Sequence, residues 1–165
     1  MSEQPRTLEF RNNGVIDSLT LTMAPALFYE NLRRELANAQ RQGFPISVVS
    51  LTLMDDSGLS GAGRGGDLDS LLVFHSEVSL IEEVLIRLAF ELQQAIRSDE
   101  FFSRICESGF WWLVHGDFEV AAMAVDRIVN TLTPEVALRF HIHPWGHGQS
   151  LEDFVAEIDK AQFST

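Results

Sequence analysis

The stretch that decides the fold is Arg97–Val114, which reads RSDEFFSRICESGFWWLV. It contains two short runs rich in aromatic and β-branched residues, Phe101–Cys106 and Phe110–Val114. Between them lies Glu107-Ser108-Gly109, and Ser-Gly is a dipeptide typical of turns. The stretch therefore predicts a β-hairpin.

Helices and strands are predicted on both sides of this hairpin from apolar spacing and from glycine and proline at their ends. The expected elements are a helix over 24–40, a strand over 46–53, helices over 80–96 and 118–132, a strand over 136–142 and a last helix after Ser150. This order predicts an α/β sandwich with a mixed sheet.

Composition sets limits on the class of protein. The chain has 165 residues, of which 45% are hydrophobic and 22% charged, as expected of one folded domain. It carries 24 acidic and 12 basic residues, so its formal net charge is −12. Such a charge argues against nucleic acid and anionic membrane as partners, because both are bound by clustered cations.

The single cysteine, Cys106, excludes an intramolecular disulfide and a multi-cysteine metal site. The first ten residues do not resemble a signal peptide, and no apolar run is long enough to span a bilayer. We therefore expect no membrane insertion and a cytoplasmic location.

Several short motifs occur in an order that resembles a known family. The hairpin segment R-S-D-E-F-F-S-R-I-C-E-S-G-F is similar to R-x-x-D-x-x-x-R-[YF]-G-G-[DE]-E-F. Asp17-Ser18-Leu19-Thr20 is similar to the start of D-x-L-T-G-L, with Leu21 in place of the glycine, and Asp159-Lys160-Ala161 to the start of D-K-A-L-Y, with Gln162 and Phe163 in place of Leu and Tyr. These are motifs of GGDEF domains, the diguanylate cyclases, which condense two GTP into cyclic di-GMP. The resemblance covers residues 17–163.

The resemblance implies a GGDEF-like α/β sandwich whose central sheet is mixed, mostly antiparallel and flanked by helices. The domain is expected over 17–165, after an N-terminal tail over 1–16. The region 54–79 is about a dozen residues longer than in the family, and an extended loop is predicted there.

The residues that bind metal and nucleotide in the family are replaced at the matching positions of this chain. Diguanylate cyclases hold a divalent metal with carboxylates, which hard cations require. By register, Thr52 and Ser108-Gly109 stand where the family has those carboxylates, and Cys106 and Glu107 replace its two glycines. We therefore expect no enzyme activity, no metal and no cofactor.

A pseudoenzyme that regulates through protein contacts is the favoured role, with a protein partner or a second copy as its target. The predicted contact face consists of Cys106, Glu107, Ser108, Gly109 and Trp111. Because Trp111 and Trp112 alternate along a strand, one is expected in the core and the other partly outward. Coverage of both by the 54–69 loop is the alternative.

A second role would be that of a cyclic di-GMP receptor. Arg97 and Glu100 occupy the positions of the family's product-binding R-x-x-D site, and arginine recognises phosphate or guanine oxygens bidentately. The alternative is that Arg97 lies near the C-terminus of its helix, where a cation is favourable.

Two other patterns permit a functional and a structural interpretation. The run Ser60–Gly66, SGAGRGG, is similar to a phosphate-binding loop but lacks its Lys-Ser/Thr end, which favours an ordinary surface loop. In HIHPWGHG, the residues His141, His143 and His147 suggest a metal site, yet packing or edge histidines are the simpler explanation.

Overall fold

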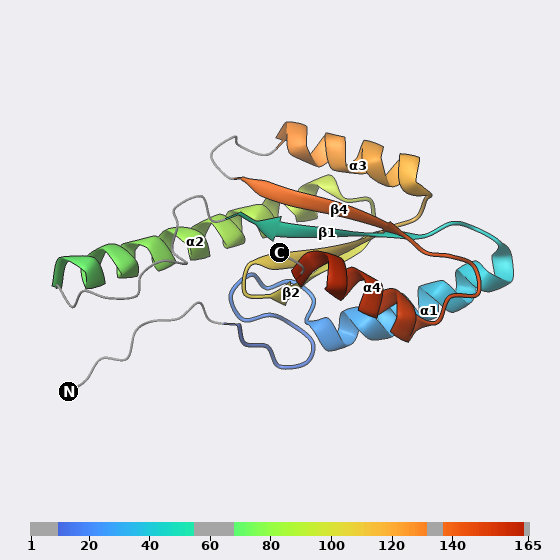
Figure 1. The fold of residues 1–165 in the computed structure, drawn as a ribbon, viewed down its shortest axis with the longest axis horizontal. Helices are drawn as coiled ribbons and strands as arrows, with labels where there is room; N and C mark the ends of the chain where they lie inside the picture. Colours follow the sequence, from blue (N-terminus) through green and yellow to red (C-terminus); the bar gives the residue numbers. More distant parts are fainter. Residues whose placement is uncertain (1–9, 55–67, 132–136, 164–165) are drawn as a thin grey trace.

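The computed structural model describes residues 10–54, 68–131 and 137–163, with the backbone alone for 68–79. The elements in chain order are α1 (Pro25–Gln42), β1 (Ser47–Leu53), α2 (Leu68–Ala95), β2 (Phe101–Cys106), β3 (Gly109–Val114), α3 (Phe118–Thr131), β4 (Leu138–Pro144) and α4 (Leu151–Phe163). Figure 1 shows the helices arranged around a single sheet. The predicted α/β sandwich is confirmed.

The four strands lie in the order β2-β3-β1-β4, and each neighbouring pair is antiparallel. The prediction of a mixed sheet is too broad, because the parallel pairing among the described residues is one isolated bridge, Met23 to Ser103. At the end of β1, Thr52 lies opposite Gly109 on one side and Arg139 on the other.

Side chains alternate along the central strand, so the sheet has a core on each face. On one face Val49 and Leu51 pack with Trp112 against α2 and α3. On the other, Val48 packs with Trp111 against α1 and α4. A sheet covered on both faces has no solvated side, which explains why β1 carries apolar residues on both of its faces.

The ends of α1 follow from its sequence. Pro25 occupies the first helical position, where a missing N–H has no cost. Gly43 adopts the left-handed conformation (φ 76°), and its backbone N–H donates to the Ala39 carbonyl, as predicted for a glycine terminus. None of the described helices is both long and apolar enough to cross a bilayer.

Two predicted boundaries are wrong. Helix α2 begins at Leu68, so residues 68–79 are helical rather than part of an extended loop over 54–79. Leu71, Phe74 and Val78 continue the helical spacing of the following residues, a signal obscured by the adjoining glycines. The predicted tail over 1–16 is shorter, because the Val15 carbonyl accepts a hydrogen bond from the backbone N–H of Ala24. The segment SGAGRGG lies outside the described residues.

Candidate functional site

The β2–β3 turn lies against the end of the central strand. Glu107 and Ser108 connect the two strands, and the Ser108 carbonyl accepts a hydrogen bond from the backbone N–H of Leu53 at 2.9 Å. A register shift between Arg104 and Cys106 precedes the turn. The predicted hairpin is confirmed, and its turn stands beside Thr52, as the family register requires.

A glutamine from α4 closes the space beside Thr52. The Gln162 amide nitrogen donates to Thr52 Oγ1 at 3.2 Å, and its carbonyl oxygen accepts from the Trp111 indole N–H. Gln162 is only 7% exposed. The polar atoms here are neutral and already paired, so they offer no carboxylate to a cation.

Gln162 is a site residue that the sequence analysis missed. Its partner Thr52 lies 110 residues away in the chain, so no local pattern connects them. The available signal was a departure from the family, because Gln162 stands where the family motif D-K-A-L-Y has leucine.

Gly109 is held in a space that admits no side chain. A Cβ at this position would lie 2.5 Å from the Gln162 amide nitrogen, 2.9 Å from Cys106 Sγ and 3.2 Å from the backbone oxygen of Leu51. The glycine is therefore needed for the close approach of α4 to the hairpin.

Gly109→Ala is expected to lower the free energy of unfolding by about 1–3 kcal/mol, the usual cost of overpacking. In a Gln162→Ala background the same change should cost less, because the Gln162 amide nitrogen, the atom nearest to the new Cβ, is then absent. Urea denaturation of the two single variants and the double variant measures this coupling. Additive effects would show that Gln162 does not press against Gly109.

The surroundings of Cys106 disfavour the thiolate form of its side chain. Burial raises the pKa of its thiol, although backbone N–H groups of Ser108 and Gly109 and the charge of Arg104 act in the opposite direction. A thiol binds metals as the thiolate, so a raised pKa weakens Cys106 as a ligand at neutral pH. Among the residues with described side chains, no group of three or more His, Cys, Asp or Glu could hold an ion.

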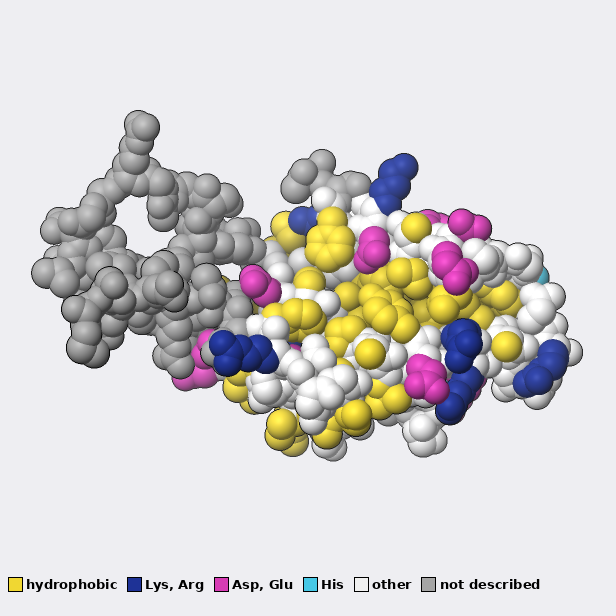
Figure 2. Space-filling view, turned by 90° about the horizontal axis from the view of Figure 1, so that it is seen from below, with side chains coloured by type: hydrophobic (Ala, Val, Ile, Leu, Met, Phe, Trp, Pro, Cys, Tyr) yellow, Lys and Arg dark blue, Asp and Glu magenta, His cyan; other side chains and the backbone are white. Residues whose placement is uncertain are grey.

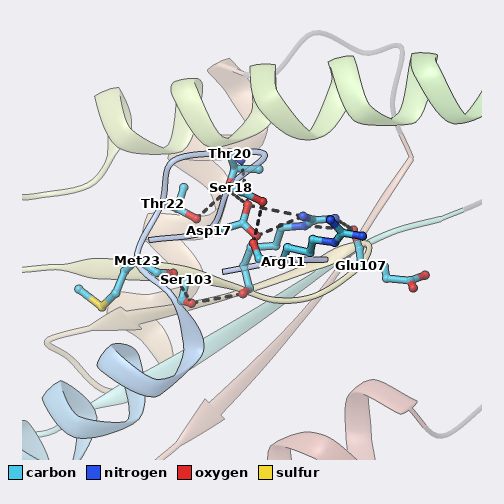
Figure 3. A network of polar contacts seen from close by, with 9 residues as sticks. Arg11, Asp17, Ser18, Thr20, Thr22, Met23, Ser103 and Glu107 are labelled. Atoms are coloured by element: carbon cyan, nitrogen blue, oxygen red, sulfur yellow. Dashed lines mark hydrogen bonds and ion pairs between the residues drawn. The ribbon is translucent and has the colours of Figure 1, made fainter. Parts of the chain in front are cut away.

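A buried ion pair connects the turn to the N-terminal loop. Arg104 and Asp17 are both fully buried, with 3.2 Å between Nη1 and Oδ1. Arg104 also donates to the Glu107 carbonyl through Nε (3.2 Å) and Nη2 (2.7 Å). Thr20 donates to Asp17 Oδ2 through its backbone N–H and its hydroxyl. Figure 3 shows Asp17 within this network and the Glu107 side chain directed away from it.

This network gives the surviving motif residues a structural role. Asp17 and Thr20 belong to the segment that resembles D-x-L-T, and Arg104 to the segment that resembles R-[YF]-G-G. Together they fix two loops relative to each other. The residues that match the family motifs here therefore stabilise the fold.

Leu21 has an unusual backbone at the tip of the N-terminal loop. Its φ is 58°, the left-handed region that costs a non-glycine residue about 1–2 kcal/mol. The side chain is 76% exposed. The family motif L-T-G-L has glycine at this position, so a strained and exposed leucine replaces a residue suited to the turn.

The expectation for the two tryptophans is wrong. Both Trp111 and Trp112 are fully buried, because helices cover both faces of the sheet. Trp111 packs edge-to-face against Phe28 and Tyr29 of α1. Trp111 therefore does not belong to an exposed contact face. Of the other predicted residues there, Glu107 is exposed, Cys106 and Ser108 are partly exposed, and Gly109 is buried.

The predicted ligand residues Arg97 and Glu100 do not form an exposed pair. Arg97 is exposed, whereas the Glu100 side chain is buried. Its carboxylate accepts hydrogen bonds from the backbone N–H of Arg97 at 3.0 Å and from the Trp112 indole at 3.2 Å. Glu100 thus stabilises the α2–β2 connection, and ligand binding at Arg97 stays a prediction.

The histidines of β4 have packing partners. The rings of His141 and His143 stack at 6.2 Å, and His143 Nε2 lies 3.2 Å from the Ser50 hydroxyl. His147 instead packs on Trp145, with ring centroids 5.0 Å apart. The structure therefore brings two of the three predicted histidines together and favours the packing interpretation.

Stability is expected to decrease as the pH falls below about 6.5, the value for histidine in an unfolded chain. Burial and the neighbouring His141 lower the pKa of His143, with Glu157 opposing them. Below this pH the histidine is protonated in the unfolded chain but stays neutral in the folded protein. The free energy of unfolding therefore becomes smaller as the pH falls. Urea titrations at several pH values should show this slope, and His143→Gln should reduce it. An unchanged slope in that variant would refute the assignment.

Neither the models of protein families nor the curated proteins contain a match to this chain. Solved structures do match. A microbial GGDEF domain with cyclic di-GMP has a TM-score of 0.70 at 17% identity, over 90% of this chain and 88% of that one. The GGDEF domain of DgcB from Caulobacter crescentus in complex with c-di-GMP has a TM-score of 0.70 at 16% identity, with coverages of 94% and 92%. The chain has the GGDEF-domain fold.

The fold also matches a cyclase crystallised with a protein. SiaD, a diguanylate cyclase from Pseudomonas aeruginosa in complex with its activator SiaC, has a TM-score of 0.66 at 19% identity, over 88% of this chain and 55% of that one. The GGDEF resemblance predicted from short motifs is thus confirmed for the fold. On this GGDEF fold, the residues that differ from the family motifs near the end of the central strand include Thr52, the Cys106–Gly109 turn and Gln162.

Proposed function

We propose that this GGDEF-fold domain does not condense GTP and that it regulates cyclic di-GMP-linked signalling by binding another protein. The observation that carries the proposal is the closed cluster of Thr52, Gly109, Trp111 and Gln162 at the end of the central strand. A cyclase requires metal-bound triphosphate at this end of the sheet, and the cluster offers it neither charge nor space.

The charges near the turn also disfavour a triphosphate. Glu107 adds an exposed carboxylate where the family has glycine. The Met54 thioether, at the second position of the family's D-x-D motif, contacts the Arg139 guanidinium (3.0 Å) and is a soft group unsuited to magnesium. Arg104, the nearest buried cation, is already paired with Asp17. Metal-assisted phosphoryl transfer needs the opposite arrangement.

The proposed contact surface consists of the Glu107–Ser108 turn and the exposed Leu21. Both loops are fixed by the Arg104 network, so their side chains are presented without much loss of entropy on binding. Figure 2 shows hydrophobic and charged side chains side by side on one face of the molecule. In the proposed surface, Leu21 is 76% exposed and the Glu107 carboxylate is also exposed, and such a combination of apolar and charged groups suits a protein partner better than a nucleotide.

The test of inactivity is turnover of GTP with Mg²⁺ or Mn²⁺, followed by mass spectrometry of the products. We expect cyclic di-GMP at the level of a control without protein, while an active GGDEF domain assayed in parallel yields product. Accumulation that scales with the amount of this protein would refute the proposal.

The contact surface is tested by capturing partners from the native cell with the wild type and with Leu21→Gly/Glu107→Arg. Neither change removes a buried contact, and glycine suits the positive φ of Leu21, so the thermal melt should be retained. We expect the variant to lose a partner that Glu152→Arg, an exposed change on α4, retains. Equal capture by both variants would place the interface elsewhere.

A further inference from the structure

Strand β4 forms one edge of the sheet. It pairs with β1 without interruption from Leu138 opposite Leu53 to Pro144 opposite Ser47. Within the described ranges 10–54, 68–131 and 137–163, no strand pairs with the other side of β4. The backbone N–H and C=O groups of alternate residues of β4 therefore point away from β1 along a regular edge.

A groove runs along this edge beneath α3, and Figure 1 shows α3 beside β4. It has a volume of about 430 Å³ and is lined by Phe118, Ala122, Val125 and Asp126 of α3 and by Phe140, His141 and Ile142 of β4. Phe118 is 54% exposed at its mouth. The groove is thus largely apolar, with the strand edge as one wall.

Natural sheets usually protect such an edge with a bulge, a lysine or an early proline. β4 has no bulge in its register, contains no lysine, and reaches proline only at its last residue. An unprotected regular edge can accept another strand, because the backbone of that strand matches the alternating N–H and C=O groups along the edge.

The sequence of β4 is suited to pair with itself. In an antiparallel pair centred on His141, Phe140 of one copy lies opposite Ile142 of the other. Both side chains lie on the α3 face and contribute to the same apolar core, so the cross-strand pairs are apolar. Such a pairing closes with two-fold symmetry, in which each copy uses the same patch.

Charge supports a second copy at this place. The chain has a net charge of −12, so most of its surface repels another copy. β4 itself contains no carboxylate; it carries Arg139 and two histidines, and the groove beside it is lined by one carboxylate, Asp126. The β4 edge is therefore a region of low repulsion in an acidic protein.

We propose that two copies associate through antiparallel β4–β4 pairing, which joins their sheets into one of eight strands. The surface is distinct from the Glu107–Ser108 turn, so this inference stands independently of the proposed function.

Sedimentation velocity over a range of concentrations, combined with hydrogen exchange, tests the proposal. The wild type should form dimers, and the amides of β4 should exchange more slowly as the concentration rises. Phe118→Glu places a carboxylate in the groove at the first residue of α3, where the helix dipole favours it and folding is preserved. It should shift the protein to monomer. Met123→Glu, equally exposed on α3 but outside the groove, should remain dimeric.

Three results would overturn the proposal. One is a monomer at every concentration, which would show that a second copy does not pair with β4 and that any strand bound there comes from a different protein. Another is a dimer that Phe118→Glu leaves intact. The third is concentration-dependent protection confined to segments other than β4.

Discussion

Arg104→Met is expected to lower the free energy of unfolding by about 3–5 kcal/mol, the range for removing one partner of a buried ion pair. The change leaves the fully buried Asp17 carboxylate without its cation, although Thr20 still donates to it. It also removes both side-chain donors to the Glu107 carbonyl. Urea denaturation followed by circular dichroism measures the loss.

The matched control is Arg34→Met. Arg34 pairs with Glu30 on the exposed side of α1 at 2.8 Å, and solvent screens this pair. Its loss should cost at most about 0.5 kcal/mol. Adding Asp17→Leu to Arg104→Met should recover part of the stability, because no unpaired charge then remains buried. Equal losses for Arg34→Met and Arg104→Met would contradict the role assigned to the network.

Trp111→Ala is expected to cost about 3–5 kcal/mol, as is usual for a fully buried large aromatic residue. The indole fills the core between the sheet and α1, where it contacts Phe28 and Tyr29, and it donates to Gln162. A thermal or chemical melt would show the loss directly. Removal of this side chain should therefore destabilise the fold as well as any surface that the fold supports.

Phe90→Ala is the control for Trp111→Ala. Phe90 is 66% exposed on α2, so its truncation should change stability by less than about 0.5 kcal/mol. Trp111→Phe should fall between the two, because it retains most of the packing and leaves the Gln162 carbonyl without its donor. If Trp111→Ala melted like the wild type, the indole would be exposed in solution, as the alternation of residues first suggested.

The hairpin and most helices could be predicted because their signals are local. The predicted strand Phe101–Cys106 has the bounds of β2, and Gly43 ends α1 as expected. These features depend on β-branched residues, a turn dipeptide and a glycine terminus, each read within a few residues. The start of α2 was missed because the glycine-rich stretch before Leu68 suggested a longer loop.

The site depends on contacts that no local pattern contains. Gln162 meets Thr52 across 110 residues, and Asp17 meets Arg104 across 87. Asp17 and Arg104 were identified from the sequence as members of two separate family motifs. Only the fold shows that the two side chains form an ion pair. Trp111 was misplaced because alternation predicts opposite faces and does not tell whether both faces are covered.

We expect that the end of the sheet beside Thr52 does not hold a metal-bound nucleotide. Isothermal titration of the full chain with GTP in the presence of Mg²⁺, repeated with Mn²⁺, tests it most directly. We predict no saturable heat at millimolar nucleotide, because the paired side chains of Thr52, Gln162 and Trp111 occupy the space at the end of β1. Saturable, metal-dependent binding of one GTP per chain would contradict the account.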